Sequence, residues 1–141
     1  MMTWRDGAIT SPKPARPDAV RQAERELRVR FPADFLAVAA VHQGARPEPA
    51  SFKLPDGSGE GIAYLLHFED NSFGNIAARI FPLQNVLLKG VIPFAEALDG
   101  NVLCFNYRKD SGNPTDEYWS EDTGPMPVAS SFTDLLTKLH E

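Results

Sequence analysis

Carboxylates are the side chains of this sequence most suited to act together in a functional site, because they recur in pairs near expected turns. Acidic residues that fall in loops or at strand ends are Asp56, Glu60, Glu69, Asp70, Asp110, Asp116, Glu117, Glu121 and Asp122. Two paired acids could serve as general acid and base, but that role needs a pocket that shifts the pKa of one of them. Since these acids stand beside Asn, Ser and Gly, one interpretation is an ordinary solvated face.

A partner-binding face is the second interpretation of the same acids. Tyr118 and Trp119 stand next to them in the sequence, and aromatic side chains of this kind anchor protein interfaces. The candidate partner-binding residues are Glu69, Asp70, Asp116, Glu117, Tyr118, Trp119, Glu121 and Asp122. The sequence leaves both interpretations open.

Histidine and cysteine offer less chemistry. His42, His67 and His140 are far apart and belong to no spaced metal-binding motif. Cys104 stands in an apolar segment, where a free cysteine usually behaves as a small buried hydrophobe. With no connected nucleophile, base and orienting group, we expect no catalytic residues, no metal and no cofactor, and a protein that is not an enzyme.

The segment around which the chain is organised spans residues 90–107 and is predicted to form a β-hairpin. Apolar runs at 91–95 and 102–105 are rich in β-branched and aromatic residues, and Asp-Gly-Asn at 99–101 is a strong turn signal between them. Pro93 cannot donate a hydrogen bond to a neighbouring strand. The first run is therefore expected to be an edge strand or to start beside Pro93.

Helical spacing predicts three helices. Apolar positions indicate helices at 17–28 and 32–42, which together make a helical hairpin. The C-terminal helix is predicted by Ser131 and Asp134, which approximate a capping box. Its apolar face consists of Phe132, Leu135, Leu136 and Leu139.

The remaining segments predict a single α+β domain. Residues 1–16 are expected to be an irregular lead-in, 45–61 a loop region with at most one short strand, and 75–80 a short helix, while 83–89 could be helix or strand. Strands are expected at 51–54, 62–68, 117–120 and 126–128. The predicted domain, residues 17–141, is a mostly antiparallel sheet packed by the N-terminal helical hairpin and the C-terminal helix. A chain of 141 residues suits one such domain.

The composition limits the kinds of partner that the protein is expected to bind and the cellular compartment in which it is expected to act. The net charge of −5 opposes nonspecific binding to nucleic acid and makes a basic partner more plausible. The single cysteine cannot form an internal disulfide, and no apolar run approaches the ~20 residues needed to span a bilayer. We expect a cytoplasmic protein with no export signal and no membrane segment.

The chain also resembles a known family. The matching segments are 91–95, Gly100-Asn101, 105–107, Phe-Pro-Ala-Asp-Phe at 31–35, Gln43-Gly44 and 129–136. They are similar to the SUKH superfamily, which joins eukaryotic Smi/Knr-type cell-wall regulators to bacterial immunity proteins. The structural motif that carries the resemblance is Pro93, Phe94, Gly100, Asn101 and Tyr107.

The resemblance implies an α+β fold and a binding function without catalysis. Its typical bacterial role is to bind and neutralise a cognate polymorphic toxin, often a nuclease. The alternative is a regulatory or scaffolding module of the Smi/Knr type with no toxin partner. Asn106 departs from the family pattern, which commonly has Asp there, so a role that depends on that carboxylate does not carry over.

Overall fold

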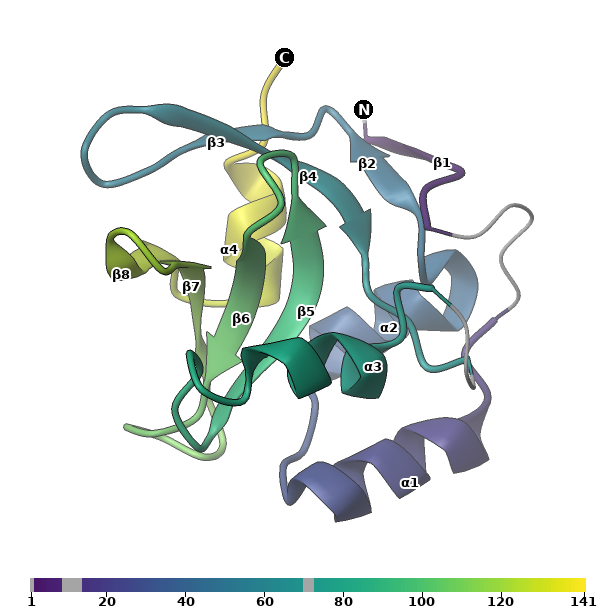
Figure 1. Cartoon of the computed structure of the whole chain (residues 1–141). Helices are drawn as coiled ribbons and strands as arrows, with labels where there is room; N and C mark the ends of the chain where they lie inside the picture. The colour runs from purple at the N-terminus through teal and green to yellow at the C-terminus, as the bar shows by residue number, and fades with distance from the viewer. Residues whose placement is uncertain (1, 9–13, 70–72) are drawn as a thin grey trace.

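The structure is a computed structural model that describes residues 2–8, 14–69 and 73–141 (Figure 1). Its strands are β1 (Thr3–Arg5), β2 (Arg46–Glu48), β3 (Ser51–Lys53), β4 (Gly59–Leu65), β5 (Val91–Ala97), β6 (Val102–Asn106), β7 (Thr115–Ser120) and β8 (Gly124–Ala129). Its helices are α1 (Pro17–Leu27), α2 (Ala33–His42), α3 (Ile76–Ile80) and α4 (Phe132–Thr137), and a 3-10 turn, η1, covers Phe81–Leu83. These elements form one α+β domain, as the sequence predicts.

The centre of the fold is a six-stranded sheet in the order β3-β4-β5-β6-β7-β8, in which every neighbouring pair is antiparallel. A meander of this kind places alternate connections at the same end of the sheet. The β3–β4, β5–β6 and β7–β8 turns therefore share one end. The β6–β7 loop lies at the other end, on the side of α1 (Figure 1).

An aromatic cluster on one face of the sheet joins the sheet to α2 and α4. The Phe35 ring of α2 is fully buried, and its centroid lies 5.3 Å from that of Phe105 and 5.2 Å from that of Phe132. Phe94 stacks on Phe105 at 4.1 Å. Edge-to-face and stacked rings add to the free energy gained by burying their area. Figure 1 shows α3 on the opposite side of the sheet from α2 and α4.

The hairpin and the helices form close to where they are predicted, but α4 ends at Thr137, so Leu139 lies beyond the helix and not on its face. Pro93 also does not lie on an edge strand. β5 is flanked by β4 and β6, and the register of the β5–β6 pair shifts between Pro93 and Ala95. A bulge relieves the need for a hydrogen-bond donor at that position, which lets proline occupy a central strand.

The segments expected to be mostly irregular contain more strand than predicted. β1 lies in the expected lead-in and pairs antiparallel with β2, which lies in the expected loop region. Residues 83–89, whose structure the sequence left open, follow η1 as turns. Leu83 and Leu87 pack against Val102 and Trp119. These residues lie on the face of the sheet opposite α2 and α4, which we call the second face.

Candidate functional site

Three turns far apart in the sequence enclose an acidic cleft at one end of the sheet. The cleft has a volume of about 330 Å³ and is lined by residues of the β3–β4, β5–β6 and β7–β8 turns and of the strand ends beside them. Its carboxylates are Asp56, Glu60, Asp99 and Asp122, and we use the name acidic cleft for this group. The meander gathers these alternate turns at one end of the sheet. Each turn contributes at least one of the acids.

Local turn chemistry fixes the acids of the cleft. The Asp56 carboxylate accepts hydrogen bonds from the Ser58 N–H (2.9 Å) and from the Ser58 hydroxyl (2.5 Å), which lower the pKa of Asp56. The Asp99 carboxylate accepts from the Asn101 N–H at 3.0 Å. Gly100, with φ of 90°, occupies the left-handed region that this tight turn requires. Asp56 and Asp99 thus stabilise their own turns and also make the cleft acidic.

Tyr118 forms the inner wall of the cleft and holds Asp99 in place. Its hydroxyl donates to the Asp99 carboxylate and accepts from the Asn101 side-chain amide at 3.0 Å. Burial alone would raise the pKa of Asp99, but the hydrogen bonds from Tyr118 and Asn101 outweigh it and hold that pKa at about 2. Burial and the bond to Asp99 raise the pKa of Tyr118 to about 12, so the phenol remains a donor at neutral pH.

Glu60 has a raised pKa because of its surroundings in the cleft. Burial and the neighbouring Asp99 carboxylate raise the pKa of Glu60. A positive charge that entered the cleft would favour the ionised form of Glu60 and would also meet the ionised Asp99. The arrangement is therefore suited to a lysine or arginine side chain presented by a partner.

The cleft contains only part of the predicted partner-binding set. Tyr118 and Asp122 line it, and Glu121 is exposed in the same turn. Glu69 lies elsewhere, where its carboxylate accepts from the Gln43 side chain at 3.0 Å, and Asp70 lies outside the described residues. The sequence interpretation did not assign Asp56, Glu60 or Asp99 to the partner-binding set. The signal that could have identified Asp56 and Asp99 is their position in alternate turns of a meander, and Glu60 follows the first of these turns as the second residue of β4.

The expectation that these acids and aromatics share one exposed face is wrong for three residues. Asp116, Tyr118 and Trp119 are 0%, 4% and 6% exposed. Their segment begins strand β7 at Thr115 instead of ending a loop, so its side chains point alternately into the core and to the second face. Neither Tyr118 nor Trp119 is therefore available as an exposed anchor.

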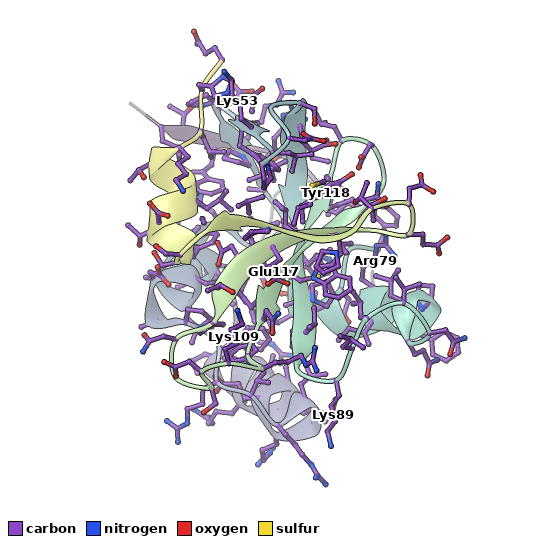
Figure 2. The ribbon with its side chains drawn as sticks, turned by 90° about the vertical axis from the view of Figure 1, so that its left-hand side faces the viewer. Lys53, Arg79, Lys89, Lys109, Glu117 and Tyr118 are labelled. Atoms are coloured by element: carbon purple, nitrogen blue, oxygen red, sulfur yellow. The ribbon has the colours of Figure 1, made fainter. Side chains whose placement is uncertain are left out.

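Glu117 lies on the second face of the sheet, near the centre of Figure 2. Both of its carboxylate oxygens accept from the Asn106 side-chain amide at 3.0 Å, and one accepts from the Trp119 indole at 3.2 Å. An acid at position 106 would instead face Glu117 with a second negative charge. The departure from the family pattern at Asn106 is thus matched by a hydrogen-bonding partner on the next strand.

His67 and Cys104 are both buried inside the domain. His67 is fully buried; its Nδ1 accepts from the Glu69 N–H at 3.1 Å, and its Nε2 lies 2.6 Å from the Phe73 carbonyl oxygen. Cys104 is fully buried, and burial raises the pKa of its thiol well above the usual range. Over residues 2–8, 14–69 and 73–141, no three His, Cys, Asp or Glu side chains are grouped so that they could hold a metal ion. No helix in the same ranges is long and apolar enough to cross a bilayer.

Comparison with known families agrees with the fold. The model of the SMI1 / KNR4 family (SUKH-1) matches residues 14–138, which is most of the chain. The chain belongs to the SUKH-1 family. No curated protein sequence matches the chain.

The structural motif residues of this SUKH-1 domain support both its core and its acidic cleft. Phe94 lies in the aromatic cluster, and Gly100 and Asn101 form the turn that positions Asp99. The Tyr107 hydroxyl donates to the Arg30 carbonyl oxygen at 2.8 Å and so ties β6 to the segment between α1 and α2. The motif thus links the centre of the sheet to both ends of the domain.

Proposed function

We propose that this protein is an immunity protein that binds and neutralises a cognate polymorphic toxin through protein–protein contact. The observation that carries the proposal is the SUKH-1 match over residues 14–138. Resemblance to that family implies a binding function, which in bacterial members is typically the neutralisation of a toxin. A cytoplasmic protein of this kind would protect the cell that produces the toxin.

The acidic cleft supports a basic partner. Asp99 stays ionised well below neutral pH, Asp56 and Asp122 are exposed beside it, and the chain carries a net charge of −5. A toxin that acts on nucleic acid needs a basic surface to hold phosphates. An inhibitor that covers such a surface with carboxylates would compete directly with the substrate.

Neutralisation without catalysis is consistent with the chemistry of the described residues. The buried His67 and Cys104 are enclosed by the core, and the carboxylates of Asp56 and Asp99 are held by turn hydrogen bonds. We therefore propose that the protein acts by occupying the toxin surface and uses no cofactor.

The test begins with the neighbouring gene, because an immunity protein should be encoded beside a long secreted protein with a C-terminal toxin domain. The toxin domain is expressed from an inducible promoter with and without this protein, and growth is followed. We expect growth to be restored when this protein is present, and a complex of the two purified proteins to form.

The same experiment separates the alternative function. A regulatory or scaffolding module would lie beside no toxin gene and would restore no growth. Rescue by an unrelated acidic protein of similar net charge would also contradict specific neutralisation.

A further inference from the structure

A groove with basic walls lies at the end of the domain opposite the acidic cleft. It has a volume of about 910 Å³ and runs between α1, the α1–α2 segment and the β6–β7 loop. Its walls carry Arg21, Arg25, Arg28 and Arg30, and we use the name basic groove for this region. Lys89 and Lys109 lie toward the same end of the molecule, while Lys53 lies at the other end (Figure 2).

The four arginines of the basic groove are exposed. Within the described part of the chain, none of their guanidinium groups forms an ion pair with a carboxylate. The one acid in the lining, Glu24, already accepts a hydrogen bond from the Phe31 N–H at 2.7 Å. The groove is therefore strongly positive on a chain whose net charge is −5. Unpaired guanidinium groups are well suited to bind carboxylates in a bidentate manner.

Arg28 occupies a backbone conformation that favours glycine. It follows α1 as the C-cap with φ of 58°, in the left-handed region. Glycine is the residue usually found at such helix ends, because a side chain there strains the backbone. The sequence has a long cationic side chain at this position instead, and that side chain lines the groove.

The floor of the basic groove is apolar. Val29 and Pro32, which are half-buried, give it accessible apolar surface, and Phe31 and Tyr107 also line it. The rings of Phe31 and Tyr107 are buried, and the Tyr107 hydroxyl is bonded to the Arg30 carbonyl oxygen. A basic rim over an apolar floor matches an extended peptide in which acidic and apolar side chains alternate, because successive side chains of such a peptide point in opposite directions.

We propose that the basic groove binds an extended acidic peptide segment of a partner protein. Single-stranded nucleic acid fits less well, because the aromatic rings of the lining are buried and offer no stacking platform for bases. A second copy of this chain fits less well because its acidic region is itself a cleft. This binding is independent of the toxin partner proposed above.

The test uses fluorescence anisotropy with a short labelled peptide of alternating glutamate and leucine. We expect saturable binding, weaker binding of a glutamate–serine peptide, and no binding of a lysine–leucine peptide. The double variant Arg21→Glu/Arg25→Glu should weaken binding by about tenfold or more, because two attractive charges become repulsive. Lys53→Glu is the matched control, since it reverses an exposed charge outside the groove and should change the affinity by less than about twofold.

Arg28→Gly separates binding from folding. The affinity for the peptide should fall several-fold, because the cationic side chain is lost. The melting temperature should rise or stay unchanged, because glycine removes the backbone strain. A structural role alone would leave peptide affinity unchanged in this variant.

Three results would overturn the proposal. The first is the absence of binding, or an equal loss of affinity in Lys53→Glu. The second is tighter binding of a single-stranded oligonucleotide than of the glutamate–leucine peptide. The third is concentration-dependent self-association, measured by analytical ultracentrifugation, that the groove variants abolish.

Discussion

Asp116 is a carboxylic acid whose ionised form the fold disfavours. Its carboxyl group is fully buried, and neither of its oxygens has a hydrogen-bond partner among the described residues. Burial, reinforced by the nearby carboxylates of Asp34 and Asp134 and partly offset by Lys138, raises the pKa of Asp116 to about 8. At neutral pH the folded protein therefore holds this group mainly as the neutral acid.

This raised pKa predicts a loss of stability at alkaline pH. The pKa of Asp116 is about 8 in the folded protein against an ordinary value of 3.8, so the folded state binds the proton more tightly than the unfolded chain. Its contribution to the free energy of unfolding is fully present below about pH 4 and is lost as pH rises through about 8, by several kcal/mol in total. Urea unfolding at about pH 5 and about pH 9 measures this difference.

Asp116→Asn is the matched variant, because the amide keeps the size of the side chain and cannot ionise. We expect the variant to lose most of the pH dependence over this interval and to be more stable than the parent at alkaline pH. Parallel pH profiles for the two proteins would show that Asp116 does not ionise in this way.

At the scale of elements, the β5–β6 turn builds the acidic cleft and depends on one glycine. Gly100 has φ of 90°, and no described atom lies within 4 Å of the position that a Cβ would take. Any cost of a side chain at this residue is therefore a backbone cost, without steric collision. Gly59 also has open space around that position but lacks the positive φ, so it isolates the effect of the backbone.

Gly100→Val should reduce the free energy of unfolding by about 1 kcal/mol or more, whereas Gly59→Val should have a smaller effect. The reason is that a β-branched side chain is poorly accommodated in the left-handed region. Equilibrium urea unfolding of the two variants and the parent compares these costs. Equal costs at the two glycines would mean that the turn does not impose the strain.

Sequence patterns predicted the helices and strands that have local turn, capping or apolar-spacing signals. They missed the strands that form only by pairing with residues far away in the sequence. The hairpin at 91–106 and the final helix follow from apolar spacing and from Gly100 and Ser131. Strands β1 and β2 are three residues each and pair across about forty positions, so they leave no local period. The acidic cleft was missed for the same reason, since three separate turns must meet before Asp99 becomes part of a site.

At the scale of the whole molecule, the meander separates charge of opposite sign. Alternate turns carry the acids of the acidic cleft to one end, while the arginines of α1 and its C-terminal segment lie at the other end. The net charge of −5 conceals this polarity. A partner with a basic surface would thus be oriented toward the acidic end before contact, because long-range fields act during encounter.

Association kinetics with the proposed toxin partner test this orientation. The double variant Glu121→Lys/Asp122→Lys reverses two exposed charges at the acidic end and should slow association by about tenfold at low salt. It should also flatten the dependence of the association rate on ionic strength, because fewer charges remain to be screened. The dissociation rate should change less, since it reflects mainly the short-range contacts of the complex.

Glu26→Lys provides the control, because it reverses an exposed charge on α1 at the basic end. It should leave the association rate nearly unchanged if the acidic end meets the toxin first. An association rate that is insensitive to salt, or that responds equally to changes at both ends, would mean that the acidic cleft does not guide the encounter.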